Sequence, residues 1–312
     1  LGASAGIALF PADANNRVEL LKNADLALYK AKGSGRNRYR FFERRMDREA
    51  QARKRLEREL RRALTQETLT LHYQPQLDLA SGRFTAAEAL LRWPHPEDGF
   101  IPPGEFIPVA EASGLIRLLG AWSVRQAWHE ARRWREQGLE VTMAINVSAA
   151  QLRHAETLDA IRATLADEGP DRGWIELELT ESLLVDALEA DTRGFLKGIV
   201  ELGVPLAIDD FGTGYSSLAY LCRLPVQKIK IDRSFVHELD RNPETQAVVE
   251  AIVAMARALG KTIVAEGVET LRQLELVRDL GCHMAQGYLL AEPMPPEAAA
   301  RLLGVRGRLQ PA

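Results

Sequence analysis

The chain has 312 residues, of which 46% are hydrophobic and 27% are charged, with a formal net charge of −3. This length suits one large domain or two smaller ones. No apolar run approaches the roughly 18 residues that a membrane helix needs, and no signal peptide opens the chain, so we expect no membrane contact within it. Because the first residue is Leu1, we expect a piece of a longer polypeptide, which could carry a membrane anchor upstream.

Cysteine and histidine usage argues against a zinc protein. Cys222 and Cys282 are far apart in sequence and lack the short spacing of zinc ligands, which favours a reduced, cytoplasmic setting. The six histidines are scattered, with no H-E-x-x-H spacing. A metal in this protein would therefore be held mainly by oxygen ligands.

The charge is unevenly distributed along the chain. Residues 1–62 carry 16 Lys and Arg against 8 Asp and Glu, a net charge of +8, so the remainder carries −11. An acidic domain does not attract nucleic-acid polymers through its field. If its substrate is anionic, cations must mediate the contact.

The first 65 residues predict two pieces. Residues 1–42 indicate a strand, "ASAGIALFP", a helix, "NRVELLKNADLALYKAK", and a glycine-rich break. This piece is too short for an independent core, so we interpret it as the tail of a domain. Residues 43–65 are highly charged and free of Gly and Pro, which predicts a solvent-exposed connecting helix.

From residue 66 onward, short apolar segments alternate with helical ones. The predicted strands are 69–79, 84–93, 141–148, 174–182, 205–211, 227–235, 262–268 and 283–290. Eight strands over residues 66–312 are typical of an α/β protein with a (β/α)8 TIM-like barrel. The turn between the first two, "ASGR", is too short for a parallel crossover, which predicts an antiparallel first strand. The alternation alone also fits a doubly wound open sheet.

Side-chain parity separates two faces on the predicted strands, because alternate residues point to opposite sides. In "IELELT", Glu176 and Glu178 share the face opposite the apolar residues, and in "KIKID" Lys228 and Lys230 do the same. The apolar face of a barrel strand packs on the helices. The polar face must therefore line the interior or its rim.

Polar residues recur near the carboxyl ends of these strands, where barrel active sites are built. They are Glu88, Asn146, Glu178, Asp209, Asp210, Lys230, Glu266 and Gln286. Singly, each has an ordinary explanation: Asn146 turns the chain, Asp210 caps a helix, or Lys230 lies on the surface. Recurrence at one strand end after another favours a joint site. Carboxylates and an amide without clustered histidines suit two Mg²⁺ or Mn²⁺ ions.

The adjacent aspartates Asp209 and Asp210 could bridge two such ions, one pointing inward and the other over the rim. Two metals roughly 3.5–4 Å apart recur in phosphodiester cleavage, where they activate a water and stabilise charge on phosphate. Lys230 could orient that water or neutralise the phosphorus centre, and Arg92 could bind a phosphate oxygen. The segment "FGTGYSS", residues 211–217, matches no nucleotide-binding loop, and we expect a loop over the metal site.

Seven motifs together resemble the EAL family of cyclic-di-GMP phosphodiesterases. They are "EALLRW", "NVS", "ELTES", "DDFGTGYSSL", "KIDRSF", "AEGVET" and "QGYLL", which occur in the family's order. The resemblance spans roughly residues 66–303. It implies a barrel with an antiparallel first strand that opens cyclic di-GMP to linear 5′-pGpG.

The resemblance also implies roles for individual residues. The metal ligands would be Glu88, Asn146, Glu178, Asp209, Asp210 and Glu266. Lys230 would be the catalytic lysine, and the general base would be either Glu266 or the bridging hydroxide. Gln74, Arg92 and Gln286 would contact substrate, while Glu181 and Glu269 would anchor the loop after the fifth barrel strand.

Members of this family that have lost the site act as receptors or scaffolds, so a catalytically silent cyclic-di-GMP receptor or scaffold is the alternative. The resemblance further implies a homodimer through the barrel. Residues 1–42 resemble the C-terminal part of a GGDEF diguanylate cyclase domain. The signature hairpin of that family is not in this chain, so no cyclase activity is expected of it.

Overall fold

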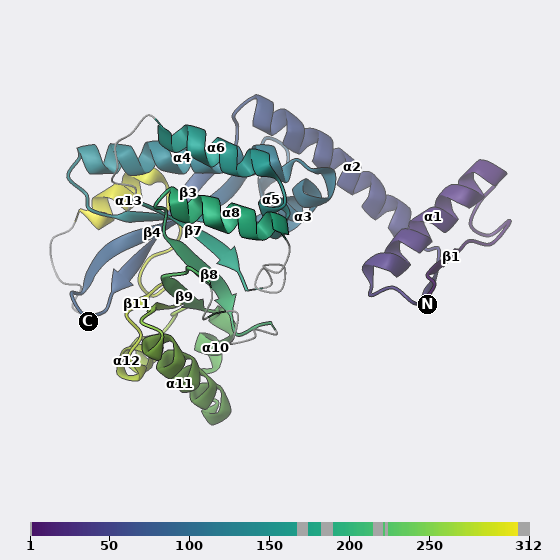
Figure 1. The fold of residues 1–312 in the computed structure, drawn as a ribbon. Helices are drawn as coiled ribbons and strands as arrows, with labels where there is room; N and C mark the ends of the chain where they lie inside the picture. The colour runs from purple at the N-terminus through teal and green to yellow at the C-terminus, as the bar shows by residue number, and fades with distance from the viewer. Residues whose placement is uncertain (1, 167–173, 182–189, 215–220, 222–223, 305–312) are drawn as a thin grey trace. The chain divides into compact units, whose positions relative to one another are not determined.

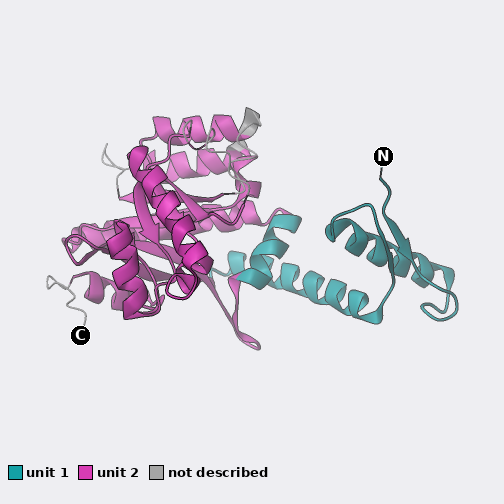
Figure 2. Cartoon of the chain, turned by 90° about the horizontal axis from the view of Figure 1, so that it is seen from below, with its two compact units in different colours: residues 1–67, 104–113 teal, residues 68–103, 114–312 magenta. Residues whose placement is uncertain are grey.

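The computed structural model describes residues 2–166, 174–181, 190–214, 221 and 224–304. Its backbone divides into two compact units, residues 1–67 with 104–113 and residues 68–103 with 114–312 (Figure 2). Among the described residues, no helix has both the length and the apolar character required to cross a membrane.

The first unit begins with a two-stranded parallel sheet and a helix. Strands β1 (Ala5–Ile7) and β2 (Tyr39–Phe41) pair with each other, and α1 (Arg17–Gly33) connects them. Strand β2 lies in a stretch that we predicted only as a break. The charged helix α2 (Arg44–Thr65) follows, close to its predicted range. A small apolar cluster of Ala27, Phe42 and Met46 joins α1 to the start of α2.

The second unit contains a closed barrel of eight strands, as predicted (Figure 1). In order around the barrel, they are β3 (Thr70–Asp78), β4 (Arg83–His95), β6 (Thr142–Val147), β7 (Ile175–Thr180), β8 (Leu206–Phe211), β9 (Lys228–Ile231), β10 (Thr262–Ala265) and β11 (Met284–Ala285). Pairing of β3 with both β4 and β11 closes the ring. The open-sheet alternative is therefore excluded.

Strand β3 is antiparallel to both of its neighbours, and the other pairings within the barrel are parallel. The tight connection from β3 to β4 contains Gly82, whose φ is +70°. Such a short turn can join only antiparallel strands. An additional strand that we did not predict, β5 (Gly99–Ile101), extends β4 as a hairpin outside the ring.

Helices alternate with the barrel strands along the chain (Figure 1). The described ones are α3 (Pro103–Ser113), α4 (Ile116–Glu136), α5 (Ala149–Leu152), α6 (Ala155–Ala166), α8 (Ala190–Glu201), α10 (Arg233–Glu238), α11 (Pro243–Ala258), α12 (Leu271–Leu280) and α13 (Pro296–Leu303). Most of α3 clusters with the first unit. The interleaving of these helices with parallel strands brings the carboxyl ends of the strands to one mouth of the barrel.

The interior of the barrel holds charged side chains, as parity predicted. Lys228 Nζ lies 2.6 Å from Glu176 Oε1, and Lys230 Nζ lies 2.8 Å from Glu178 Oε2. Strand β8 separates β9 from β7 in the sheet. These contacts must therefore run across the interior. They form two polar layers, with the Lys230 layer nearer the carboxyl ends of the strands.

Candidate active site

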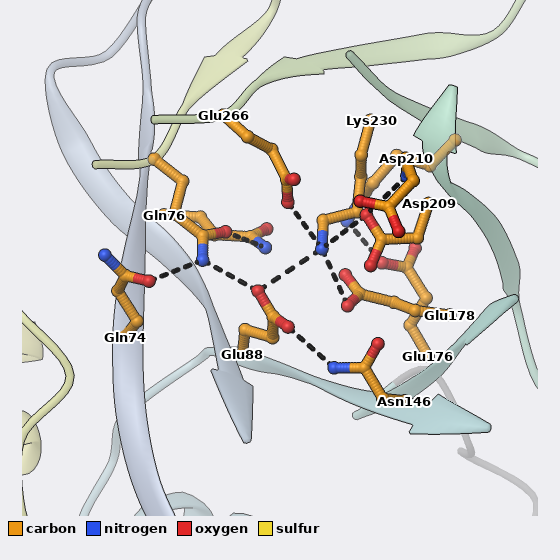
Figure 3. A network of polar contacts seen from close by, with 12 residues as sticks. Gln74, Gln76, Glu88, Asn146, Glu176, Glu178, Asp209, Asp210, Lys230 and Glu266 are labelled. Carbon is orange, nitrogen blue, oxygen red and sulfur yellow. Dashed lines mark hydrogen bonds and ion pairs between the residues drawn. The ribbon is translucent and has the colours of Figure 1, made fainter. Parts of the chain in front are cut away.

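The predicted strand-end residues converge at one mouth of the barrel (Figure 3). Glu88 comes from β4, Asn146 from β6, Glu178 from β7, Asp209 and Asp210 from β8, and Lys230 from β9, while Glu266 and Gln286 directly follow β10 and β11. Glu88 lies in the middle of the long strand β4, whereas the other groups lie at or just after the ends of their strands. The barrel topology therefore assembles one site from segments far apart in sequence.

Lys230 is the centre of this site and has no exposed surface. Its Nζ lies 2.6 Å from Glu266 Oε1, 2.8 Å from Glu178 Oε2, and 3.2 Å from both Glu88 Oε2 and Asp209 Oδ1. Burial lowers the pKa of Lys230, but the four carboxyl groups raise it further, so the net shift is well above its usual range. The lysine is therefore a fixed positive charge.

The surrounding carboxyl groups differ in their tendency to ionise. Burial raises the pKa of Glu178 well above its ordinary value and that of Glu266 to about 8, although Lys230 opposes both shifts. Burial also acts to raise the pKa of Glu88, but Lys230, Gln286 and Asn146 outweigh it, and the net shift is downward. One lysine cannot stabilise every neighbouring carboxylate in its ionised form.

The site has an excess of acidic groups over positive charge. Lys230 supplies one positive charge, against the five carboxyl groups of Glu88, Glu178, Asp209, Asp210 and Glu266, an excess of four negative charges if all are ionised. Divalent cations are the usual way to compensate such an excess.

The oxygen atoms form two overlapping sets that could each hold a cation. In one set, oxygens of Glu88, Glu178 and Asp209 all lie within 4.8 Å of one another; in the other, those of Asp209, Asp210 and Glu266 do. Asp209 belongs to both. Glu178 Oε1 is buried without a hydrogen-bond partner among the described residues. An all-oxygen donor set with an unpartnered carboxylate oxygen fits a hard divalent cation.

A local irregularity in β8 explains how two adjacent aspartates serve one site. The pairing of β8 with β9 shifts register between Ile208 and Phe211, and Asp210 has φ +53° in the left-handed region. Aspartate tolerates this conformation better than most residues. The Asp210 backbone N–H donates to Asp209 Oδ1 at 2.9 Å. Burial and neighbouring Asp209 raise the pKa of Asp210 to about 6.

Three buried glutamines flank Glu88, and one of them was not predicted. Gln74 and Gln76 lie on the same face of β3, and both join a hydrogen-bonded chain through Gln286. Gln286 Nε2 also donates to Glu88 Oε2 at 2.7 Å. The i, i+2 spacing of Gln74 and Gln76 was the signal available in the sequence, because it places both on the interior face.

The predicted phosphate-binding residue Arg92 is half-buried on β4. Its Nη1 donates to the Leu91 carbonyl at 2.8 Å. Burial lowers the pKa of Arg92, while Tyr288 and Glu88 oppose that shift. The role of Arg92 toward a phosphate stays a prediction.

The two predicted loop anchors have different surroundings. Glu181 is buried, and its Oε2 accepts hydrogen bonds from Gly212 N–H at 2.7 Å and Gly214 N–H at 3.1 Å. It therefore contacts the start of the loop after β8, the fifth barrel strand. From Tyr215 onward, that glycine segment lies outside the described residues, as does Cys222. The Glu269 carboxylate lies 3.9 Å from His237 Nδ1 at an exposed position, and its role as a loop anchor stays a prediction.

A cavity of about 550 Å³ opens at this mouth of the barrel. Its lining includes Gln74, Glu88, Asp209, Asp210, Glu266 and Gln286, together with Thr213, Asp232, Arg233, Gly267, Glu269, Gly287 and Tyr288. The exposed ring of Tyr288 was not singled out from the sequence, although it directly follows the "QG" pair. An acidic floor, with Arg233 and an aromatic ring in the lining, suits an anionic ligand bound together with cations.

Comparison with known families and structures agrees with this architecture. A family model described as "EAL domain" matches residues 57–293. The chain is 44% identical to a solved structure described as "PaMucR Phosphodiesterase, c-di-GMP complex", with a TM-score of 0.74, over 78% of this chain and 99% of that one. It is 40% identical to the EAL domain of DcpA from Mycobacterium smegmatis, with a TM-score of 0.65, over 78% of this chain and 100% of that one.

Two longer relatives come from Pseudomonas aeruginosa. The bifunctional diguanylate cyclase/cyclic di-GMP phosphodiesterase MucR is 46% identical over 95% of this chain and 43% of its own length. The cyclic di-GMP phosphodiesterase NbdA is 43% identical over 96% of this chain and 38% of its own length. The chain thus spans less than half the length of these relatives.

Proposed function

Because this chain belongs to the EAL domain family, we propose that its barrel hydrolyses cyclic di-GMP to linear 5′-pGpG in second-messenger signalling. The observation that carries the proposal is the buried ammonium of Lys230 among four carboxylates from four different segments, at the mouth of a barrel. The reaction adds water across one phosphodiester bond. A new P–O bond forms, the bond from phosphorus to the 3′ oxygen breaks, and that oxygen takes a proton.

The cofactor in this proposal is a pair of Mg²⁺ or Mn²⁺ ions. Glu88, Asn146, Glu178, Asp209, Asp210 and Glu266 would hold them, and the fit rests on the two overlapping oxygen sets. When bound, the ions would supply activation of the attacking water and neutralisation of phosphate charge.

The remaining steps fall to the side chains of the site. Lys230, held protonated by its neighbours, would stabilise the negative charge that develops on the phosphate oxygens. By the resemblance to the family, Glu266 is a candidate general base for the attacking water, and its Oε1 lies 2.6 Å from Lys230 Nζ at the mouth of the barrel. A water activated by the ions alone is the competing assignment. Gln74, Arg92 and Gln286 would orient the nucleotide.

The test is to incubate the protein with cyclic di-GMP in Mn²⁺ and in EDTA, and to identify the product by chromatography and mass spectrometry. Conversion to pGpG in Mn²⁺ alone would support the proposal. Tight binding without product over hours in Mn²⁺ would replace it with the receptor. The absence of any ligand-induced thermal shift would favour a scaffold that ignores the nucleotide.

Three further proposals concern the surroundings of this site. We propose a cytoplasmic location, a homodimer formed through the barrel, and an origin of residues 1–42 in a GGDEF domain. Light scattering at working concentration tests the dimer, and a monomer would contradict it. The activity of a longer parent protein would be tested separately, by assaying it for cyclic-di-GMP synthesis from GTP.

A further inference from the structure

Gln76 on β3 is a buried polar side chain beside the site but outside the lining of the cavity, and the proposed chemistry gives it no role. It has no exposed surface, and its Nε2 donates to Gln286 Oε1 at 2.8 Å. Gln76 Oε1 has no hydrogen-bond partner among the described residues. A buried amide oxygen without a partner destabilises the folded state. The presence of a polar side chain at this buried position therefore calls for an explanation.

Both hydrogens and the oxygen of the Gln286 amide take part in hydrogen bonds to its neighbours. Its Nε2 donates to Gln74 Oε1 at 2.9 Å and to Glu88 Oε2 at 2.7 Å, while its Oε1 accepts from Gln76. An amide nitrogen has two hydrogens, so both donors are used. Gln286 itself is almost fully buried. These contacts suit a residue that holds Glu88 rather than one that contacts a ligand directly.

Gln76 supports the orientation of the Gln286 amide that the Glu88 carboxylate requires. The two ends of a glutamine amide have nearly the same shape, so packing alone does not distinguish them. The Glu88 carboxylate only accepts, so Gln286 Nε2 faces it, and the Gln76 donor satisfies the Gln286 Oε1 at the other end of the amide. In the reversed orientation, the amide oxygen would face the Glu88 carboxylate, and two acceptors would meet without a proton.

The same contacts orient the Glu88 carboxylate. Its Oε2 accepts from Gln286 and lies 3.2 Å from Lys230 Nζ, while its Oε1 accepts from Asn146 Nδ2 at 2.6 Å (Figure 3). Residues that hydrogen-bond to a metal ligand commonly set the orientation of that ligand. Their loss typically costs about 10–100-fold in metal affinity or activity.

We propose that Gln76 is a positioning residue that, through Gln286, holds the Glu88 carboxylate in the orientation required of a cation ligand. The inference rests on the proposed function, because it assigns Glu88 to a cation. It adds Gln76 to the residues on which that function depends. It also changes the expected role of Gln286 from contacting the substrate to holding Glu88.

The first test is Gln76→Met, which keeps the length of the side chain and removes its donor. In substrate-free protein, we expect Mn²⁺ affinity, measured by electron paramagnetic resonance titration, to fall about 10–100-fold. At limiting Mn²⁺, kcat falls while KM for cyclic di-GMP stays constant, and excess Mn²⁺ recovers kcat. A merely structural role would leave the Mn²⁺ titration unchanged.

The matched control is Gln227→Met. Gln227 Oε1 accepts from Leu206 N–H at 2.8 Å, at the strand starts and therefore at the opposite end of the barrel. This variant also loses one side-chain hydrogen bond, but we expect wild-type Mn²⁺ affinity. An equal loss of Mn²⁺ affinity in both variants would overturn the inference.

A double-mutant cycle tests whether Gln76 acts through Gln286. Gln286→Met alone should weaken Mn²⁺ binding at least as much as Gln76→Met, and adding Gln76→Met should weaken it no further. Additive losses would overturn the inference. If Gln76→Met does not fold, Gln286→Met measured against Gln227→Met carries the test, with the same expected loss.

Mn²⁺ titration of the wild-type protein distinguishes failure of the Gln76 inference from failure of the proposed function. Wild-type protein that binds Mn²⁺ and forms pGpG, with Gln76→Met behaving identically, would overturn the inference and leave the proposed function standing. Wild-type protein that binds no Mn²⁺ would overturn both.

Discussion

The barrel interior holds two lysines on one strand in very different surroundings. Lys228 pairs with Glu176 at 2.6 Å, one positive charge against one negative. Lys230, two residues further along β9, lies within 3.2 Å of four carboxylates from four different segments. Strand geometry and burial are shared, so the difference between the two layers is their charge balance.

This difference separates a structural role from a functional one. A balanced buried pair satisfies its own charges and requires no further ligand. A buried cluster with excess negative charge is costly in isolation, and such costs usually persist only where function requires them. The Lys228 layer therefore serves as an internal control for the Lys230 layer.

The largest expected effect is that of Lys230→Met on turnover. Loss of a positioned charge that acts on the transition state should reduce kcat by about 10²–10³-fold, with KM little changed. Steady-state kinetics with saturating Mn²⁺ and cyclic di-GMP would measure it. A variant with more than a tenth of wild-type kcat would remove Lys230 from the proposed mechanism.

Lys228→Met should instead reduce stability. Removing one partner of a buried ion pair typically costs about 3–5 kcal/mol, because the other charge is left uncompensated. We expect urea unfolding to shift accordingly, while the kcat of the folded protein stays near wild type. The double variant Lys228→Met/Glu176→Leu should recover much of the lost stability. A large kcat defect in Lys228→Met would contradict the purely structural role of the Lys228 layer.

The excess of carboxyl groups in the Lys230 layer predicts an unusual pH dependence of the unfolding free energy in EDTA. The pKa of Glu266 is raised to about 8, so the folded state keeps a proton that the unfolded state releases near its ordinary value of 4.5. The unfolded state then binds fewer protons, and the contribution of Glu266 to stability falls as pH rises between these values.

Glu266→Gln should therefore flatten the dependence of unfolding free energy on pH between about 5 and 8. Denaturant titrations at several pH values in EDTA would compare it with wild type. Glu269→Gln, at an exposed position on the same rim, is the matched control and should leave the slope unchanged. An unchanged slope in Glu266→Gln would mean that Glu266 ionises normally.

The smallest expected effect concerns Glu181, which accepts hydrogen bonds from Gly212 and Gly214. In Glu181→Gln, the charge-assisted bonds become neutral ones, each weaker by about 1 kcal/mol. We expect turnover to fall about 5–10-fold through a less firmly held loop. Glu201→Gln on α8, whose partner Lys197 is exposed, is the control. Equal activity of the two variants would contradict the role of Glu181 as a loop anchor.

Much of the architecture could be predicted from the sequence, because it depends on local periodicity. Alternation of apolar and polar residues located the eight barrel strands and assigned Glu178 and Lys230 to the interior face. The short turn before Arg83 predicted the antiparallel first strand. Strand β5 was missed, because its three residues carry no period of their own.

The membership of the site was also available from the sequence, because the carboxyl ends of barrel strands meet at one mouth. The contacts within it were not. Parity would have placed Asp209 and Asp210 on opposite faces, whereas the register shift and left-handed backbone at Asp210 bring both to the cavity.

By itself, the sequence determined the eight strands, the antiparallel first strand and the residue types near the strand ends, since these follow from spacing along single segments. Closure of the strands into a barrel was decided by the pairing of β3 with both β4 and β11. Only the tertiary structure decided that Lys230 contacts four carboxylates at once and that Gln76 reaches Glu88 through Gln286. Those contacts join residues up to 210 positions apart. Closure of the barrel brings these residues into contact, and local sequence patterns do not predict which residues meet.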